Sequence, residues 1–142
     1  MKTKNDSLNT IDGISKLEYN WNENGADPIP KKVIDLSKEI IMILDVQPEI
    51  FCTANDSIQF EYTKENGDYL EFEIFEDKIN VLEVFQSSYD NSRRTTVDIN
   101  NYIVLSDILN DFMLNRYKNN INRMIADIPN FNCAYEGRFI DD

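Results

Sequence analysis

The residues of this sequence that could do chemistry are carboxylates followed by a lysine. Asp56 or Asp68, followed by Glu76-Asp77-Lys78, matches the acid and later Glu-x-Lys pattern of metal-dependent nucleases. In such a site the carboxylates would hold Mg²⁺ and the lysine would orient or deprotonate water. The spacing is loose for a chain with 26 acidic residues, and the triplet falls in a predicted turn. A carboxylate enzyme is therefore an alternative hypothesis.

Other catalytic groups are missing from the sequence. The chain has no histidine, which is the commonest general base and metal ligand. It has no G-x-S-x-G motif, no glycine-rich phosphate loop and no zinc spacing. Cys52 and Cys133 stand far apart, so neither forms a local redox pair or a thiolate metal site. The sequence predicts a non-enzymatic, reduced, cytoplasmic protein without a cofactor or metal.

Charge defines the partners that the protein can attract. The formal net charge is -12, and residues 49–92 carry eleven acids against only Lys64 and Lys78. This excess repels phosphate groups, so direct binding to nucleic acid or to an anionic membrane is disfavoured. No segment approaches the roughly 20 apolar residues that span a bilayer. We expect a basic protein partner.

Four glutamates in the acidic segment are the candidate partner-binding residues. They lie on neighbouring predicted strands, and we expect them to face solvent together: Glu61, Glu71, Glu73 and Glu83. One interpretation is a solvated sheet face that discourages aggregation. The other is an acidic docking surface. Like charges that face each other across strands reduce stability, and this cost has to be offset elsewhere.

Trp21 and the Arg93-Arg94 pair are further candidates, and both lie in predicted loops. Trp21 is expected to be largely buried and to pin the Asn- and Pro-rich segment 20–30 onto the core, with ligand stacking as the alternative. Arg93 and Arg94 are expected in a polar loop over 86–94, either solvated or in contact with an anion or partner.

Periodicity predicts helices at both ends of the chain. Residues 1–9 are polar and expected to be disordered, and a short helix is expected over about 10–19. A second helix should open at Pro30 or Lys31 and end before Pro48. A third is expected over about 100–118, and apolar spacing continues to Pro129. Its predicted apolar face contains Ile103, Leu105 or Ser106, Leu109, Phe112 and Met113.

The middle of the chain alternates between apolar and polar residues, as strands do. Predicted strands cover 50–53, 58–63, 70–74, 79–85 and 95–99, with Asn66-Gly67 in the first hairpin turn. The fold class is α+β, an antiparallel β-meander of about four to five strands with helices packed on one face. Residues 10–142 should form a single domain.

One loop carries a resemblance. The segment Asn20–Pro30, then a helix, Gln47–Phe51 and Ser57–Tyr62, resembles small bacterial and phage proteins with the pattern W-(D/N)-x-x-G-A-x-P-(I/V). The likeness covers about residues 17–85, and the chain departs from it at Ala54 and Ser57. It implies one compact fold and a mobile-element or accessory-gene setting, and it transfers no catalytic residue.

Together these features favour a non-enzymatic accessory or inhibitor, such as an antitoxin, an immunity protein or an anti-defence protein, that docks on a basic partner. The alternatives are the carboxylate enzyme and a self-associating structural protein, in which a helix or strand edge makes a symmetric homodimer.

Overall fold

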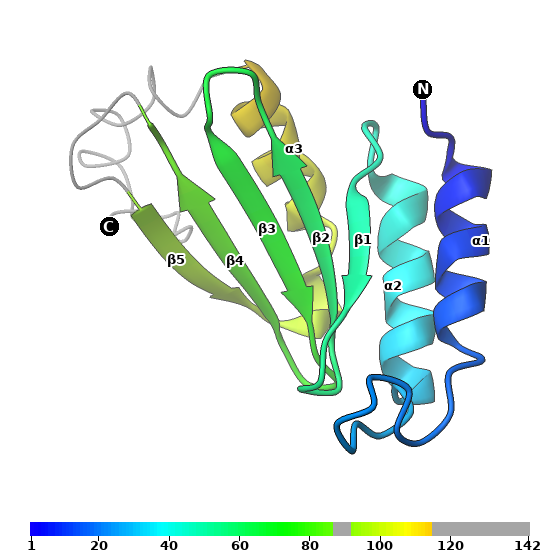
Figure 1. Ribbon diagram of the computed structural model, residues 1–142. Coiled ribbons are helices and arrows are strands. Elements are labelled where there is room, and N and C mark those ends of the chain that lie inside the picture. Colours follow the sequence, from blue (N-terminus) through cyan, green and yellow to red (C-terminus); the bar gives the residue numbers. More distant parts are fainter. Residues whose placement is uncertain (87–91, 115–142) are drawn as a thin grey trace.

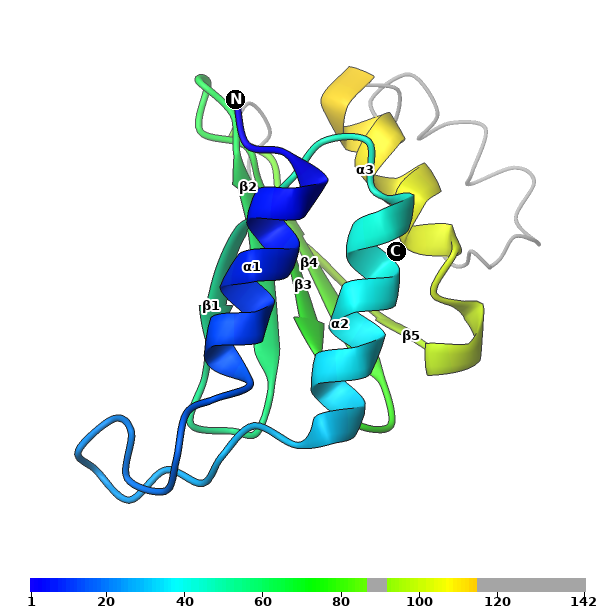
Figure 2. The same cartoon turned by 90° about the vertical axis from the view of Figure 1, so that its right-hand side faces the viewer.

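The structure is a computed structural model that describes residues 1–86 and 92–114. A five-stranded antiparallel sheet in the order β1-β2-β3-β4-β5 forms one layer, and helices form the other (Figure 1). Figure 2 shows the helices α1, α2 and α3 gathered on the same side of this sheet. The predicted α+β class and meander are confirmed.

The first helix, α1 (Lys4–Ile14), starts earlier than predicted. Thr3 and Asp6 form a capping box in which each side chain accepts a hydrogen bond from the other residue's backbone N–H. The Lys4 Nζ also donates to the Met42 carbonyl at 2.7 Å and so ties the helix start to the end of α2. The predictions of a disordered 1–9 segment and of a helix over 10–19 are therefore wrong.

The second helix, α2 (Lys31–Ile43), agrees with the prediction. Pro30 is its N-cap, where its fixed φ suits helix entry. Gln47 Nε2 donates to the Leu44 carbonyl at 2.9 Å beyond the helix end. The buried face of α2 packs against α1 and against strands β2 and β3.

The strands form a meander with one buried face. They are β1 (Glu49–Cys52), β2 (Ile58–Thr63), β3 (Tyr69–Ile74), β4 (Ile79–Val84) and β5 (Ser92–Val97). Alternate residues of β2 and β3 are buried, among them Phe60 and Phe72, which lie directly opposite each other. Gly67 (φ +92°) closes the predicted Asn-Gly turn. A Cβ there would come within 2.8 Å of the Gln86 side chain.

The last strand and helix differ from the prediction at their starts. β5 begins at Ser92 because its polar first half pairs with β4, so Arg93 and Arg94 lie in a strand and the predicted loop does not extend to them. A 3₁₀ turn, η1 (Ile99–Asn101), precedes α3 (Val104–Leu114).

The buried face of α3 contains Leu105, Leu109 and Phe112, as predicted. Ile103 is 66% exposed, so its predicted place on that face is wrong. Lys64 Nζ, in the β2–β3 hairpin, donates to the Phe112 carbonyl at 2.6 Å and lies over the Phe112 ring. This lysine therefore joins the hairpin to the last turn of α3, where a cation is favourable. The apolar positions predicted after Leu114, together with Cys133, lie outside the described residues.

Candidate functional site

The sheet has an inner face toward the helices and an outer face that no described helix covers (Figure 2). On the central strands the inner positions are buried and the outer ones are half-buried or exposed. We define the outer face by the residues that alternate with the buried ones: Glu49, Phe51, Gln59, Glu61, Thr63, Tyr69, Glu71, Glu73, Asn80, Leu82, Val84, Ser92, Arg94 and Thr96.

A row of like charges crosses the outer face. Glu49 lies directly opposite Glu61, and Glu61 lies directly opposite Glu71. Like charges that face each other across strands destabilise a sheet. The structure thus brings together two of the four predicted glutamates and adds Glu49. Sequence reasoning missed Glu49 because the first strand was expected to begin one residue later.

Glu73 lies on the same face in the neighbouring row, between Gln59 and Asn80. The Ser57 hydroxyl donates to its Oε2 at 2.6 Å, and Ser57 is fully buried. Ser57 is one of the two positions at which the chain departs from the small-protein pattern. Here its hydroxyl fixes the position of an outer-face carboxylate.

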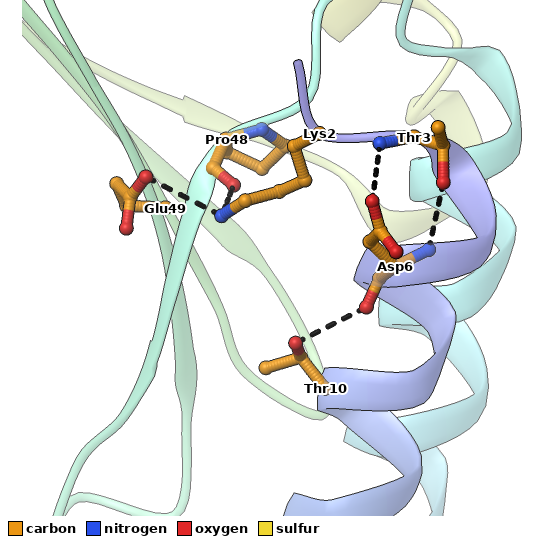
Figure 3. A network of polar contacts seen from close by, with 6 residues as sticks. All are labelled: Lys2, Thr3, Asp6, Thr10, Pro48 and Glu49. Atoms are coloured by element: carbon orange, nitrogen blue, oxygen red, sulfur yellow. Dashed lines mark hydrogen bonds and ion pairs between the residues drawn. The ribbon is translucent and has the colours of Figure 1, made fainter.

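Two contacts hold members of the glutamate row in place. Lys2 Nζ lies 3.4 Å from Glu49 Oε2 and donates to the Pro48 carbonyl at 2.9 Å (Figure 3). The Glu49 side chain is still 71% exposed, so this ion pair is weak. The Tyr69 hydroxyl donates to Glu71 Oε1 at 2.7 Å. Partial burial, and then the bond to Glu71, raise the pKa of Tyr69, so it remains a neutral donor.

The outer face is also apolar in part. Phe51 is 48% exposed on β1, and Leu82 and Val84 are half-buried on β4. Leu82 lies directly opposite Glu71 and continues the row of glutamates, and Arg94 lies opposite Leu82 at its end. In order from β1 to β5 the row reads acidic, acidic, acidic, apolar, basic.

Glu83 is a correction to the predicted site. Its alternation matches Ile79, Val81 and Phe85, so it points to the inner face and is only 6% exposed. Arg93 lies directly opposite it and places Nε 3.1 Å from Glu83 Oε1. The prediction that Glu83 faces solvent with the other three glutamates is wrong. The alternation of the strand itself carried the signal, since Glu83 is in phase with the apolar residues.

The structure separates Asp68, one of the two candidate first acids of the nuclease hypothesis, from the Glu76-Asp77-Lys78 triplet. Asp68 is fully buried at the start of β3, where its Oδ1 accepts from the Gln86 N–H at 2.8 Å. Glu76, Asp77 and Lys78 form the exposed turn at the other end of β3. Among residues 1–86 and 92–114, no group of three or more His, Cys, Asp or Glu side chains is placed to hold a metal ion.

The Trp21 loop is stabilised by its own asparagines. Asn20 Oδ1 accepts from the Gly25 N–H at 2.7 Å, and Asn22 Oδ1 accepts from the N–H groups of Asn24 and Ala26. The indole is partly buried and packs against the core, and its Nε1 donates to the Asp27 carbonyl of the same loop at 2.8 Å. The predicted contact of Trp21 with the core is confirmed.

Comparison with known proteins adds no relative: no protein-family model, curated protein or solved structure matches this chain. The likeness of the Trp21 loop to small bacterial and phage proteins therefore stays a prediction. Within the described part of the chain, no helix combines the length and the apolar character needed to cross a membrane.

Proposed function

We propose that this protein is a non-enzymatic binding protein, an accessory or inhibitor, that docks on a basic partner protein through the outer face of its sheet. One observation carries the proposal. Glu61 lies directly opposite both Glu49 and Glu71 on a face that no described helix covers. Such a row costs folding stability, and a cationic partner would offset that cost on binding.

The exposed apolar side chain beside this row favours docking over a purely solvated face. A face that served only solubility would gain nothing from Phe51, which is 48% exposed next to Glu49 on β1. A binding surface gains from both kinds of residue, because an apolar group adds buried area while charges steer the encounter. We assign partner binding to Glu49, Glu61, Glu71 and Glu73, with Phe51 as an apolar contact.

Capture from cells that carry the gene tests this proposal. The face variant is Glu49→Gln, Glu61→Gln and Glu71→Gln. The control variant is Glu18→Gln, Glu65→Gln and Glu76→Gln, which changes exposed glutamates outside the outer face. Each triple change removes three negative charges and takes the formal net charge from -12 to -9. The two variants therefore differ in where charge is lost and not in how much.

We expect the wild type and the control variant to retain the same basic protein, and the face variant to lose it. Circular dichroism should show that all three proteins are folded. Equal retention by the face variant would contradict the proposal and assign these carboxylates to solubility. Mg²⁺-dependent nuclease activity lost in Glu76→Gln and in Lys78→Ala would instead favour the enzyme alternative.

A further inference from the structure

The pattern of the outer face restricts the shape of what binds there. Resting on the proposed function, we propose that the partner presents an amphipathic α-helix whose axis lies across the strands. Its three basic side chains, one per turn, would meet Glu49, Glu61 and Glu71, and an apolar side chain would follow over Leu82.

The direction of the row sets the axis of the ligand. The five positions of the row lie on five successive strands: Glu49, Glu61, Glu71, Leu82 and Arg94. Neighbouring strands are about 4.8 Å apart, so the carboxylates follow one another at about that spacing. A ligand that lay along β3 would meet only Glu71 and Glu73. Three directly aligned glutamates are available only to a ligand that crosses the strands.

A helix matches this spacing better than an extended chain does. Helical residues i, i+3 and i+7 share one face and rise about 4.5 and 10.5 Å along the axis, close to the roughly 4.8 and 9.6 Å of the row. In an extended segment the side chains on one face repeat at about 6.7 Å, so the third would lie about 4 Å out of step. The geometry therefore favours one helical turn per strand.

The ends of the row give the helix a direction. Leu82, with Val84 two residues further along the same strand, offers a half-buried apolar contact after the third glutamate. Arg94, exposed at the end of the row, favours an acidic residue in the helix. At the other end, Phe51 lies beside Glu49 and can pack against the aliphatic stem of a lysine or arginine. The complementary helix thus reads basic, basic, basic, apolar, acidic.

Synthetic peptides test this inference on the full-length protein. The first is a helical 20-residue peptide with Lys at i, i+3 and i+7, Leu at i+10 and Glu at i+14, on an Ala and Gln scaffold. The second has the same composition with its lysines at i, i+5 and i+10, which distributes them around the helix. The third is the first peptide with two central Ala→Pro changes that break the helix. Binding is measured by fluorescence anisotropy at low ionic strength.

We expect the first peptide to bind about tenfold more tightly than the other two, as three weak exposed ion pairs would provide. The face variant should remove that preference, and the control variant should keep it. Equal binding of the three peptides, or tighter binding of the peptide whose helix is broken, would contradict the inference that the ligand is helical. So would failure of the first peptide to bind. If the face variant still failed to capture the cellular partner that the wild type retains, the proposed function would stand and the proposed helical ligand would not.

Discussion

The two faces of the sheet treat their glutamates differently. On the inner face, Glu83 is nearly buried and lies directly opposite Arg93, with which it forms an ion pair at 3.1 Å. On the outer face, Glu61 lies between two other glutamates, Glu49 and Glu71. Opposite charges are paired where the sheet is buried, and like charges are aligned where it is open.

This difference implies that the two faces contribute differently to folding. A buried charge without a partner would be strongly destabilising, so removal of either member of the inner pair should weaken the fold. The outer row weakens the sheet slightly, and nothing in the described fold requires its alignment. We infer that the inner face accounts for stability and the outer face for association.

Truncation of a phenylalanine on each face should give the largest difference in the free energy of unfolding. Phe60 is fully buried on the inner face of β2, whereas Phe51 is 48% exposed on the outer face of β1. Phe60→Ala should lower the free energy of unfolding by about 3–5 kcal/mol, because it leaves a cavity. Phe51→Ala should change it by less than about 1 kcal/mol. Urea unfolding measures both, and equal losses would remove the distinction between the faces.

Breaking the inner ion pair should have the next largest effect. Arg93→Ala removes the cation opposite the Glu83 carboxylate, so we expect a loss of about 3 kcal/mol in the free energy of unfolding. Arg94→Ala, on the neighbouring outer position, should have little effect and serves as the control. Similar unfolding curves for these two variants would show that the buried pair does not support the fold.

Alkaline pH should act on the inner face through Tyr62. Burial raises the pKa of Tyr62, whose hydroxyl donates to the Val46 carbonyl at 2.7 Å. Because the folded-state pKa is raised, this tyrosine's contribution is complete below its unfolded pKa of about 10 and is lost as pH rises. The loss should be about 1.4 kcal/mol per pH unit above that value. Tyr62→Phe should make this part of the stability profile less steep, and an unchanged profile would contradict the assignment.

The smallest expected effect is a gain in stability. Glu61→Gln keeps the shape of the central member of the row and removes its charge, so repulsion by both neighbours disappears. We expect stability to rise by about 0.5 kcal/mol. Glu76→Gln, in an exposed turn, should not change it. A destabilised Glu61→Gln protein would mean that the row is held by interactions other than those described.

Much of the fold was predictable because it depends on local patterns. Alternation located the central strands, the Asn-Gly pair located a hairpin turn, and Pro30 marked the start of α2. The start of α1 depends on the Thr3 and Asp6 capping box, a local signal that the prediction overlooked, and on lysine contacts with carbonyl groups about forty residues away. The polar start of β5 was missed because its ladder with β4 outweighs its composition.

The candidate site was predictable only in part. Glu61, Glu71 and Glu73 were placed on the outer face by alternation, and the same rule, applied strictly, would have excluded Glu83. Glu49 required the register between β1 and β2, which the sequence does not specify because Pro48 interrupts the pattern at the strand's start. The aligned row is a property of register across three strands.

The rate of association with the captured basic partner, measured against salt, tests whether the outer face attracts that partner. Attraction to the outer face should fade as the Debye length falls from about 10 Å at 0.1 M salt to about 3 Å at 1 M. We therefore expect the wild type and the Glu18, Glu65 and Glu76 control variant to associate quickly at low salt and much more slowly at high salt. The Glu49, Glu61 and Glu71 face variant should be slow at both. A face variant with the same rate and the same salt dependence as the control would contradict the assignment of partner binding to the outer face.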